Sequence, residues 1–135
     1  MLRLDPAALR KALDQLEQAV HDHARWHDDL IRSIVCRLPC DPNDLDEKAH
    51  RQCRFGQWYY EQAPVELWEQ PAFVAIEAEH KRLHQVAAHM LREATTGVPV
   101  SREDYDELVS GGERLRLELD SLQHAIAGSL RDRDA

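Results

Sequence analysis

The sequence predicts an all-α fold, an antiparallel four-helix bundle with an additional short helix that carries a cysteine. Three observations support this fold. The chain of 135 residues has only five glycines and six prolines, and its remaining composition favours helix. Apolar residues recur at spacings of three and four along three long segments, which is the pattern of amphipathic helices. Turn-forming stretches separate these segments, and no alternation typical of strands competes, so a bundle is the expected packing.

The first predicted helix begins at Asp5 and Pro6, an N-cap residue followed by a proline that suits the first helical position. Its apolar face is expected to contain, in order, Leu9, Leu13, Leu16, Val20, His23, His27, Leu30 and Ile34. Two histidines therefore occupy positions where leucine would be expected. Pro39 and the polar stretch 41–44 should end the helix in a loop.

The second predicted element is short and irregular, and it covers roughly residues 45–60. It carries Cys53 and several aromatic side chains. Gly56 lies inside it, so we expect a broken or short helix, with a tight backbone at this glycine. Pro64 and Pro71 bracket the turn that follows.

The third predicted helix is long and runs from Pro71 to about Thr96, where Gly97 and Pro99 end it. Its inward face is expected to contain Phe73, Ile76, His80, Leu83, Ala87, Met90 and Ala94. His84 lies one position from this stripe and should also face inward.

The last predicted helix starts at Ser101, which forms a capping-box-like arrangement with Asp104. Gly112 is expected to allow a close helix contact, and the inward face should contain Tyr105, Leu108, Leu115, Leu119, Leu122 and Ile126. We expect residues 1–130 to form a single helical domain and residues 131–135 a charged, disordered tail.

The charge and hydropathy of the chain exclude several functions. With 25 acidic and 17 basic residues, the formal net charge is −8, which repels phosphate backbones and argues against nucleic-acid binding. No apolar run approaches the roughly 18 residues that span a bilayer, and the first residues lack the apolar core of a secretory signal. We therefore expect a cytoplasmic protein with no membrane insertion.

Four residues suggest a metal centre: His23, Cys53, His80 and His84. The last two form an H-x-x-x-H pair, which places both imidazoles on one face of a helix. Buried imidazoles need partners for their nitrogen atoms, so these histidines are either hydrogen-bonded core residues or ligands of a shared metal ion. Three nitrogens and one thiolate suit Zn²⁺, and bundles build metal sites from facing helices.

Three motifs also carry a family resemblance. The H-x-x-W of His23 and Trp26, the C-x-F-G-x-W that begins at Cys53, and the H-x-x-x-H of His80 and His84 occur in this order. Together they resemble the chemoreceptor zinc-binding domain, over about residues 16–91. The C-x-F-G-x-W string is the most specific of the three. The resemblance implies a three-His, one-Cys zinc site at His23, Cys53, His80 and His84.

The resemblance further implies a cytoplasmic bacterial helical module attached to chemoreceptors or diguanylate cyclases, or sometimes free-standing. Its partners would be zinc, a second copy in a homodimer, and a signalling output protein or domain, either a diguanylate cyclase or a chemotaxis component. The zinc state would control the output, and the zinc–cysteine pair would sense hypochlorous acid. We do not expect an enzyme.

The other histidines and cysteines have simpler interpretations. His27 lies one turn beyond His23 and is an alternate ligand. Cys36 and Cys40 are buried or free thiols, because an odd number of three cysteines in a helical chain argues against a disulfide framework. The remaining histidines are expected to be surface or packing residues: His21, His50, His89 and His124.

Two rival functions have weaker support. A hemerythrin-like non-haem iron bundle for oxygen binding or sensing needs carboxylates interleaved with histidines, as in H-x-x-x-E. Here His23 is followed four residues later by His27, and His50 by Arg54. A hydrolytic zinc enzyme needs an open coordination position and a general base. Four protein ligands leave no such position, and H-E-x-x-H is absent from the sequence.

Overall fold

The structure is a computed structural model that describes residues 2–134. The described residues are all-helical, which confirms the predicted fold class, and they contain three long helices, two short ones and two 3-10 turns. The long helices are α1 (Pro6–Val35), α4 (Pro71–Thr95) and α5 (Arg102–Asp134); the short ones are α2 (Ala49–Gln52) and α3 (Arg54–Glu61); the turns are Pro42–Leu45 and Val65–Leu67. None of the described helices is both long and apolar enough to cross a bilayer.

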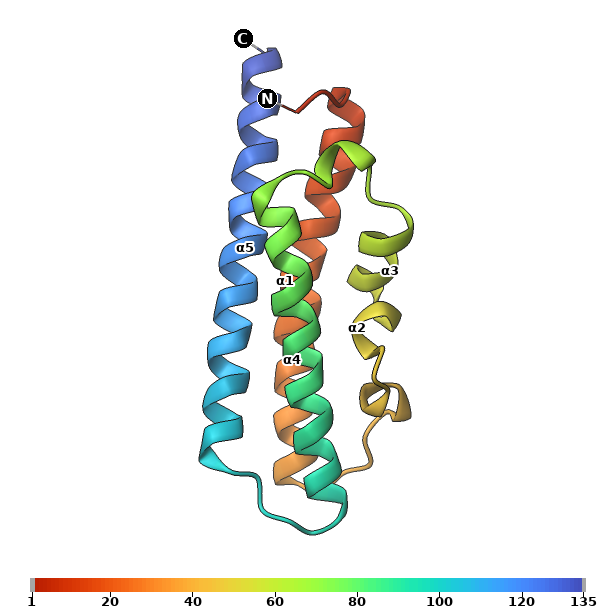
Figure 1. Cartoon of the computed structure of the whole chain (residues 1–135), viewed down its shortest axis with the longest axis vertical. Helices are drawn as coiled ribbons and strands as arrows, with labels where there is room; N and C mark the ends of the chain where they lie inside the picture. Colours follow the sequence, from red (N-terminus) through yellow and green to blue (C-terminus); the bar gives the residue numbers. More distant parts are fainter. Residues whose placement is uncertain (1, 135) are drawn as a thin grey trace.

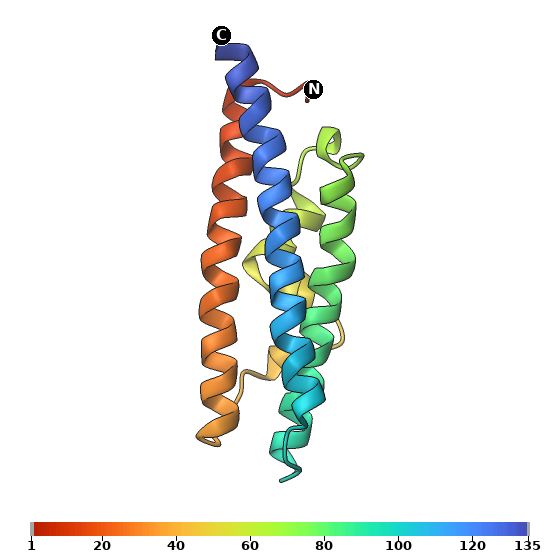
Figure 2. The same cartoon turned by 90° about the vertical axis from the view of Figure 1, so that its left-hand side faces the viewer.

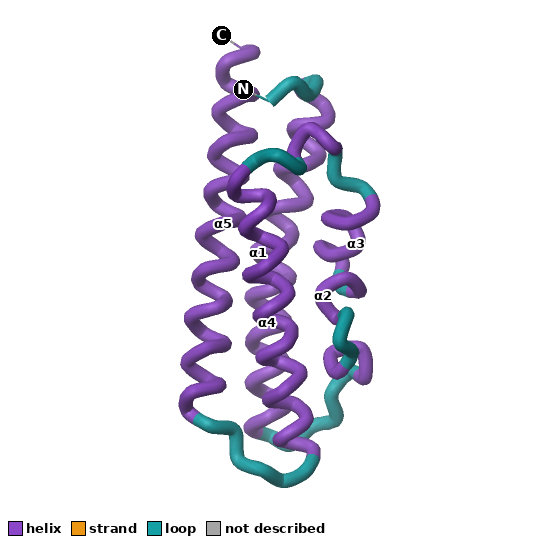
Figure 3. Tube along the Cα trace, in the orientation of Figure 1, coloured by secondary structure: helices purple, strands orange, loops and turns teal. Residues whose placement is uncertain are grey.

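The elements form an antiparallel bundle in which neighbouring segments alternate in direction. Figure 1 shows α1 and α4 running one way and α2, α3 and α5 running the other, so that the two ends of the chain lie at the same end of the bundle. The fourth position of the bundle is filled by the two short helices α2 and α3 rather than by one continuous helix (Figure 3). Helix α5 lies along both α1 and α4 (Figure 2).

The predicted helix ends are formed by local side-chain chemistry. Asp5 caps α1 by accepting a hydrogen bond of 2.8 Å from the backbone N–H of Ala8. Before α5, the Ser101 hydroxyl oxygen accepts one of 3.0 Å from the backbone N–H of Asp104. After α4 the chain reverses through Gly97, whose φ of 79° suits glycine because it lacks a Cβ.

The core lies between α1, α4 and α5 and continues under α3. Its largest fully buried side chains are Leu9, Leu16, Leu67, Ile76, Met90, Leu108, Leu115, Leu119, Leu122, Ile126 and His80. Most of them belong to the predicted inward faces. A histidine at 2% exposure among these aliphatic side chains is the exception, because imidazole nitrogens are costly to bury without partners.

The irregular segment is a broken, short helix as predicted, with the break at Cys53 and Gly56 inside α3. Two details of the prediction for α5 were wrong. Gly112 makes no close helix contact, because a Cβ there would meet nothing within 4 Å, and a Cβ at the neighbouring Gly111 would lie in ordinary van der Waals contact, 3.5 Å from Leu83. Tyr105 is 45% exposed rather than buried.

The predicted tail also differs from the structure. Helix α5 continues to Asp134, so residues 131–134 are helical rather than disordered, and Ala135 lies outside the described residues. These residues extend the last turns of a helix of 33 residues, so each additional residue adds a backbone hydrogen bond to an existing helix.

Candidate metal centre

The structure brings the four candidate ligands together from three parts of the bundle. One ligand atom from each of His23, Cys53, His80 and His84 lies within 4.8 Å of the other three. Metal–nitrogen distances of about 2.0 Å and metal–sulfur distances of about 2.3 Å place tetrahedral zinc ligands roughly 3.3–3.8 Å apart. The observed cluster is therefore at most slightly wider than a tetrahedral site requires, and the separation of 3.4 Å between Cys53 Sγ and His80 Nε2 already falls in this range.

Helix α4 contributes two of the four side chains from one face. His80 and His84 are 2% and 4% exposed, and their ring centroids lie 4.7 Å apart with the rings perpendicular. The four-residue spacing of a helix produces this arrangement, because residues i and i+4 project one above the other. The neighbouring aliphatic residues of α4 bury this face against the rest of the bundle, so both imidazoles are removed from water.

Cys53 lies at the junction between α2 and α3. Its extended backbone, with ψ of 159°, ends α2 and serves as the N-cap of α3. The sulfur accepts a hydrogen bond of 3.3 Å from the backbone N–H of Gly56 and lies 3.4 Å from Nε2 of His80. The helix break thus turns the sulfur toward the histidines of α4, and a backbone N–H at a helix start favours a negatively charged sulfur.

Gly56 makes this junction possible by bringing two backbone segments into contact. A Cβ at this position would lie 1.9 Å from the carbonyl oxygen of His50, which is far inside van der Waals contact. The same carbonyl lies 3.6 Å from the Cys53 sulfur. The prediction of a tight backbone at Gly56 is therefore confirmed, and the cause is the approach of the α2 backbone to α3.

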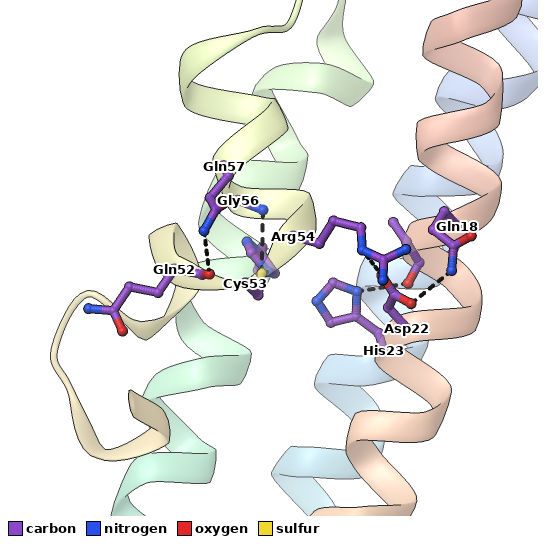
Figure 4. Close-up of polar contacts among 10 residues, drawn as sticks. Gln18, Asp22, His23, Gln52, Cys53, Arg54, Gly56 and Gln57 are labelled. Atoms are coloured by element: carbon purple, nitrogen blue, oxygen red, sulfur yellow. Dashed lines mark hydrogen bonds and ion pairs between the residues drawn. The ribbon is translucent and has the colours of Figure 1, made fainter. Parts of the chain in front are cut away.

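His23 reaches the cluster from α1. Its Nδ1–H donates a hydrogen bond of 2.9 Å to the carbonyl oxygen of Ala19, one turn earlier in the helix. This bond fixes the ring orientation and leaves the Nε2 lone pair free, which is how metal-binding imidazoles are commonly held. Figure 4 shows the ring directed across the gap between α1 and the Cys53 junction, beside an ion pair of 3.6 Å between Arg54 and Asp22.

The imidazole nitrogens of the cluster are buried without protein partners. Nε2 of His23 and both ring nitrogens of His84 are inaccessible to solvent and make no hydrogen bond. A buried polar atom left unpaired costs about 1–3 kcal/mol, and such atoms are rare in native proteins. Metal coordination would satisfy one nitrogen on each ring. The residues therefore fit a metal ion of the Zn²⁺ type, in donor set as well as in spacing.

Burial also sets the protonation of the histidines. It lowers the pKa of His84 to about 3, lowers that of His80 well below its usual value, and lowers that of His23, with the neighbouring imidazoles reinforcing the shifts in His80 and His84. All three rings are therefore neutral near pH 7, which is the form that binds metals. Burial raises the pKa of the Cys53 thiol, partly opposed by the N–H of Gly56. Without a metal the sulfur is protonated at neutral pH.

Aromatic rings enclose the histidines on the α1 side. Trp26 packs against His84 with ring centroids 4.6 Å apart, and its indole N–H donates a hydrogen bond of 3.3 Å to Asp44. Phe55 packs edge-on against His80 at 5.2 Å. These contacts agree with the prediction that the aromatic residues of the motifs pack around the site. They hold the rings in place and limit the access of water.

One face of the cluster borders an open cavity of about 500 Å³. His23, Cys53 and His84 line this cavity together with four aspartates, Asp22, Asp29, Asp41 and Asp44. Burial raises the pKa of Asp44, partly opposed by the Trp26 hydrogen bond. The cavity gives a cation or a small molecule a route from solvent to Cys53, and the carboxylates favour the approach of cations.

The other candidate residues do not belong to this cluster. His27 is outside it, so nothing in the structure supports the alternate ligand. Cys36 is exposed and Cys40 half-buried, and both are free thiols. Glu77 and Glu79 are the acidic residues nearest to His80 in the sequence, but among the described residues neither is hydrogen-bonded to it. Glu79 instead accepts a hydrogen bond of 3.0 Å from Arg114.

Sequence reasoning missed the position of His50. This residue, predicted only to lie at the surface or in the packing, is 3% exposed, and its ring lies 6.1 Å from that of His80. Its Nδ1 is buried without a partner. No periodic pattern could have revealed this burial, because α2 has only four residues.

Comparison with known proteins identifies the family. Residues 23–91 match the chemoreceptor zinc-binding domain (CZB), and this range includes all four candidate ligands. The chain belongs to the chemoreceptor zinc-binding domain family. The predicted resemblance is thereby confirmed, and the matched range begins at His23, the first residue of the first motif.

Two comparisons, one by sequence and one by structure, match the same relative. The diguanylate cyclase DgcZ of Escherichia coli (strain K12) is 24% identical over 76 residues, which cover 56% of this chain and 26% of the cyclase. The solved regulatory CZB domain of DgcZ has a TM-score of 0.77 and 18% identity, covering 88% of this chain and 98% of that chain. At this identity the structural likeness shows the shared fold. The chain spans about a quarter of the curated relative and matches its regulatory domain.

Proposed function

We propose that the chain binds one Zn²⁺ ion through His23, Cys53, His80 and His84 and acts as a regulatory module that responds to zinc or to an oxidant. The observation that carries this proposal is the set of buried imidazole nitrogens without partners, gathered within 4.8 Å of a cysteine sulfur. Bound zinc would hold the sulfur as a thiolate and join the three parts of the bundle that supply ligands.

The position of the ligands explains how metal binding could change the conformation. His80 and His84 belong to the long helix α4, and His23 to α1, whereas Cys53 joins the short helices α2 and α3 of four and eight residues. Isolated helices of this length are unstable in water, so the α2–α3 segment depends on its contacts with the bundle. We infer that the Cys53 ligand attaches this segment, and that its release loosens the segment first.

Cys53 is also the ligand that an oxidant can change. The cavity beside the cluster gives a small oxidant such as a peroxide access to the sulfur. The thiolate would attack one peroxide oxygen and the O–O bond would break; the leaving oxygen would take a proton and depart as water or an alcohol, leaving a sulfenic acid. A sulfenic acid is a poorer zinc ligand than a thiolate, so oxidation would release the α2–α3 segment as zinc loss does.

The signal would pass to an output domain or partner. DgcZ is a diguanylate cyclase that has a regulatory CZB domain. We propose a diguanylate cyclase, a chemotaxis component or another signalling protein as the recipient here. A homodimer and a cytoplasmic location remain part of this proposal. The hemerythrin-like alternative is not favoured, because the cluster among the described residues contains no carboxylate.

Metal analysis of matched cysteine variants tests the proposal. We expect the purified chain to hold one zinc per molecule, Cys53→Ser to lose most of it, and Cys36→Ser to retain it, because Cys36 is exposed and outside the cluster. Replacing a residue that only orients a metal ligand lowers metal affinity about 10–100-fold. Replacing Cys53, a proposed ligand itself, should weaken zinc binding at least as much. Unchanged zinc content in Cys53→Ser would contradict the site.

A second measurement tests the regulatory role. Zinc-loaded protein is treated with a chelator or with hydrogen peroxide, and the protease sensitivity of residues 40–65 and the molecular mass are recorded. We expect both treatments to expose this segment in the wild type, and peroxide to have no further effect in Cys53→Ser. If neither treatment changes cleavage or mass, the bound zinc is structural and the sensory role is wrong.

A further inference from the structure

A second group of possible ligands lies on the surface, away from the buried cluster. His89 and Glu93 of α4 and Asp104 of α5 each offer one ligand atom within 4.8 Å of the other two. The geometry points to a second divalent-cation site here, formed by one imidazole and two carboxylates, that takes a cation of the Mn²⁺ type. This site is separate from the proposed zinc site and shares no residue with it.

Three contacts define the group. Nε2 of His89 contacts a carboxylate oxygen of Glu93, one turn later in the same helix, and lies 3.3 Å from a carboxylate oxygen of Asp104. The spacing of four residues places the first pair on one face of α4. Asp104 is held near the start of α5 because its backbone N–H bonds to Ser101. Both carboxylates therefore converge on the same nitrogen.

The charges of the group are poorly balanced without a cation. Among the described residues, the only basic group paired with Glu93 or Asp104 is His89. One imidazole carries at most one positive charge, so the two carboxylates leave the group with a net negative charge whether or not the ring is protonated. Glu93 and Asp104 are about three-quarters buried, with 23% and 26% side-chain exposure, which weakens the screening of their repulsion by water.

A divalent cation resolves this imbalance. It would take the Nε2 lone pair of a deprotonated His89 and one or more oxygens from each carboxylate, and water would complete the shell. Carboxylate and water ligands suit Mn²⁺ and similar hard ions, and an added imidazole extends the range to transition metals. With three protein ligands the site would bind more weakly than the buried four-ligand cluster. The imidazole is 56% exposed, so the cation can exchange with solvent.

The position of this site has a structural consequence. His89 and Glu93 lie near the end of α4, Asp104 lies in the first turn of α5, and the loop around Gly97 connects them. A bound cation would join the two helix ends across this loop. We therefore expect cation binding to stabilise the α4–α5 connection at the end of the bundle away from the termini (Figure 1).

Manganese binding to zinc-loaded protein tests the proposal. Mn²⁺ competes poorly with zinc for a three-His, one-Cys site, and the electron paramagnetic resonance signal of free Mn²⁺ measures its binding. We expect one Mn²⁺ per chain in the wild type. His89→Gln and Asp104→Asn should each weaken Mn²⁺ binding at least about tenfold. This is the smallest loss of metal affinity usually seen when a residue that only orients a ligand is replaced.

Asp106→Asn is the matched control, because it removes the same charge from the same helix at an exposed residue outside the group. It should bind Mn²⁺ as the wild type does. Equal losses in Asp104→Asn and Asp106→Asn would show diffuse attraction by acidic residues and overturn the site, as would wild-type protein that binds no Mn²⁺. Zinc content, measured on the same samples, keeps this result separate from the proposed zinc function.

Discussion

Helix α4 contributes histidines to two clusters of possible ligands that differ in almost every physical respect. His80 and His84 are buried, and their cluster partners are a third imidazole and a thiol. His89, only five residues later, is 56% exposed and contacts two carboxylates. In the buried cluster, loss of hydration keeps the rings neutral, whereas at the surface the ring of His89 faces the carboxylates of Glu93 and Asp104.

The comparison shows that burial decides what a histidine can do in this protein. In the core, loss of hydration lowers the imidazole pKa and leaves nitrogen lone pairs without partners, so the cluster is suited to a soft or borderline cation. At the surface, water and carboxylates satisfy the ring, so a cation competes with existing contacts. We therefore expect strong coupling to folding at the buried cluster and weak coupling at the surface cluster.

Metal removal should show the largest difference between the two clusters. At a free zinc concentration a thousand times its Kd, zinc binding to the native buried cluster adds about 4 kcal/mol to the free energy of unfolding. A weakly bound cation at the surface cluster, present at ten times its Kd, adds only about 1.4 kcal/mol. Urea unfolding of the wild type with zinc and with a chelator measures this increment. It should vanish in Cys53→Ser and persist in His89→Gln; an increment that depends equally on both residues would contradict the comparison.

The backbone contact at Gly56 gives the next largest effect. Gly56→Ala places a Cβ 1.9 Å from the carbonyl oxygen of His50, so the junction that holds Cys53 must move. We expect a loss of about 1–3 kcal/mol, the usual cost of overpacking, together with weaker zinc binding. Gly112→Ala is the control, because its Cβ meets nothing within 4 Å; it should stabilise the helix by about 0.5–1 kcal/mol. Urea midpoints and zinc titrations measure both variants.

The pH dependence of stability should report the buried cluster. Burial lowers the pKa of His84 from 6.5 to about 3. As the pH falls, the imidazole of His84 is therefore protonated in the unfolded chain before it is protonated in the native protein. Stability of the metal-free protein is therefore fully present above about pH 6.5 and falls as the pH drops toward 3, by up to ~1.4 kcal/mol per pH unit for this residue.

Variants separate the contribution of His84 from that of other histidines. Unfolding at pH 7.5, 6.5 and 5.5 should show a shallower fall in His84→Gln than in the wild type. His124→Gln changes an exposed histidine of α5 and should follow the wild type. An unchanged slope in His84→Gln would mean that its ring is protonated or hydrated in the native state.

The surface cluster should give the smallest effect on folding. Glu93→Gln removes one carboxylate partner of His89, and exposed ion pairs contribute about 0–1 kcal/mol. In metal-free protein at neutral pH we expect the free energy of unfolding to change by no more than this, measured by urea denaturation at low and high salt. A larger loss in the free energy of unfolding would show that the surface cluster stabilises the core. The two clusters would then not differ in their coupling to folding.

Much of the fold could be predicted because the long helices have a strong apolar period and clear caps. Asp5, Pro71 and Ser101 mark three helix starts through local hydrogen bonds or restricted backbone angles, and the structure has helices beginning beside each of them. The short segment was harder. A helix of four residues has no period to detect, so the burial of His50 and the break at Cys53 were not predictable in detail.

The sequence by itself determined the helical class and the inward faces, because spacing along a helix fixes which side chains share a face, and its motifs singled out the four proposed zinc ligands. Only the tertiary structure decided that Cys53 approaches His80, that Gly56 must accommodate the His50 backbone, and that Asp104 meets His89 and Glu93 across a loop. The physical reason is that these contacts join segments far apart in the chain. Their geometry depends on how whole helices pack, which no local pattern encodes.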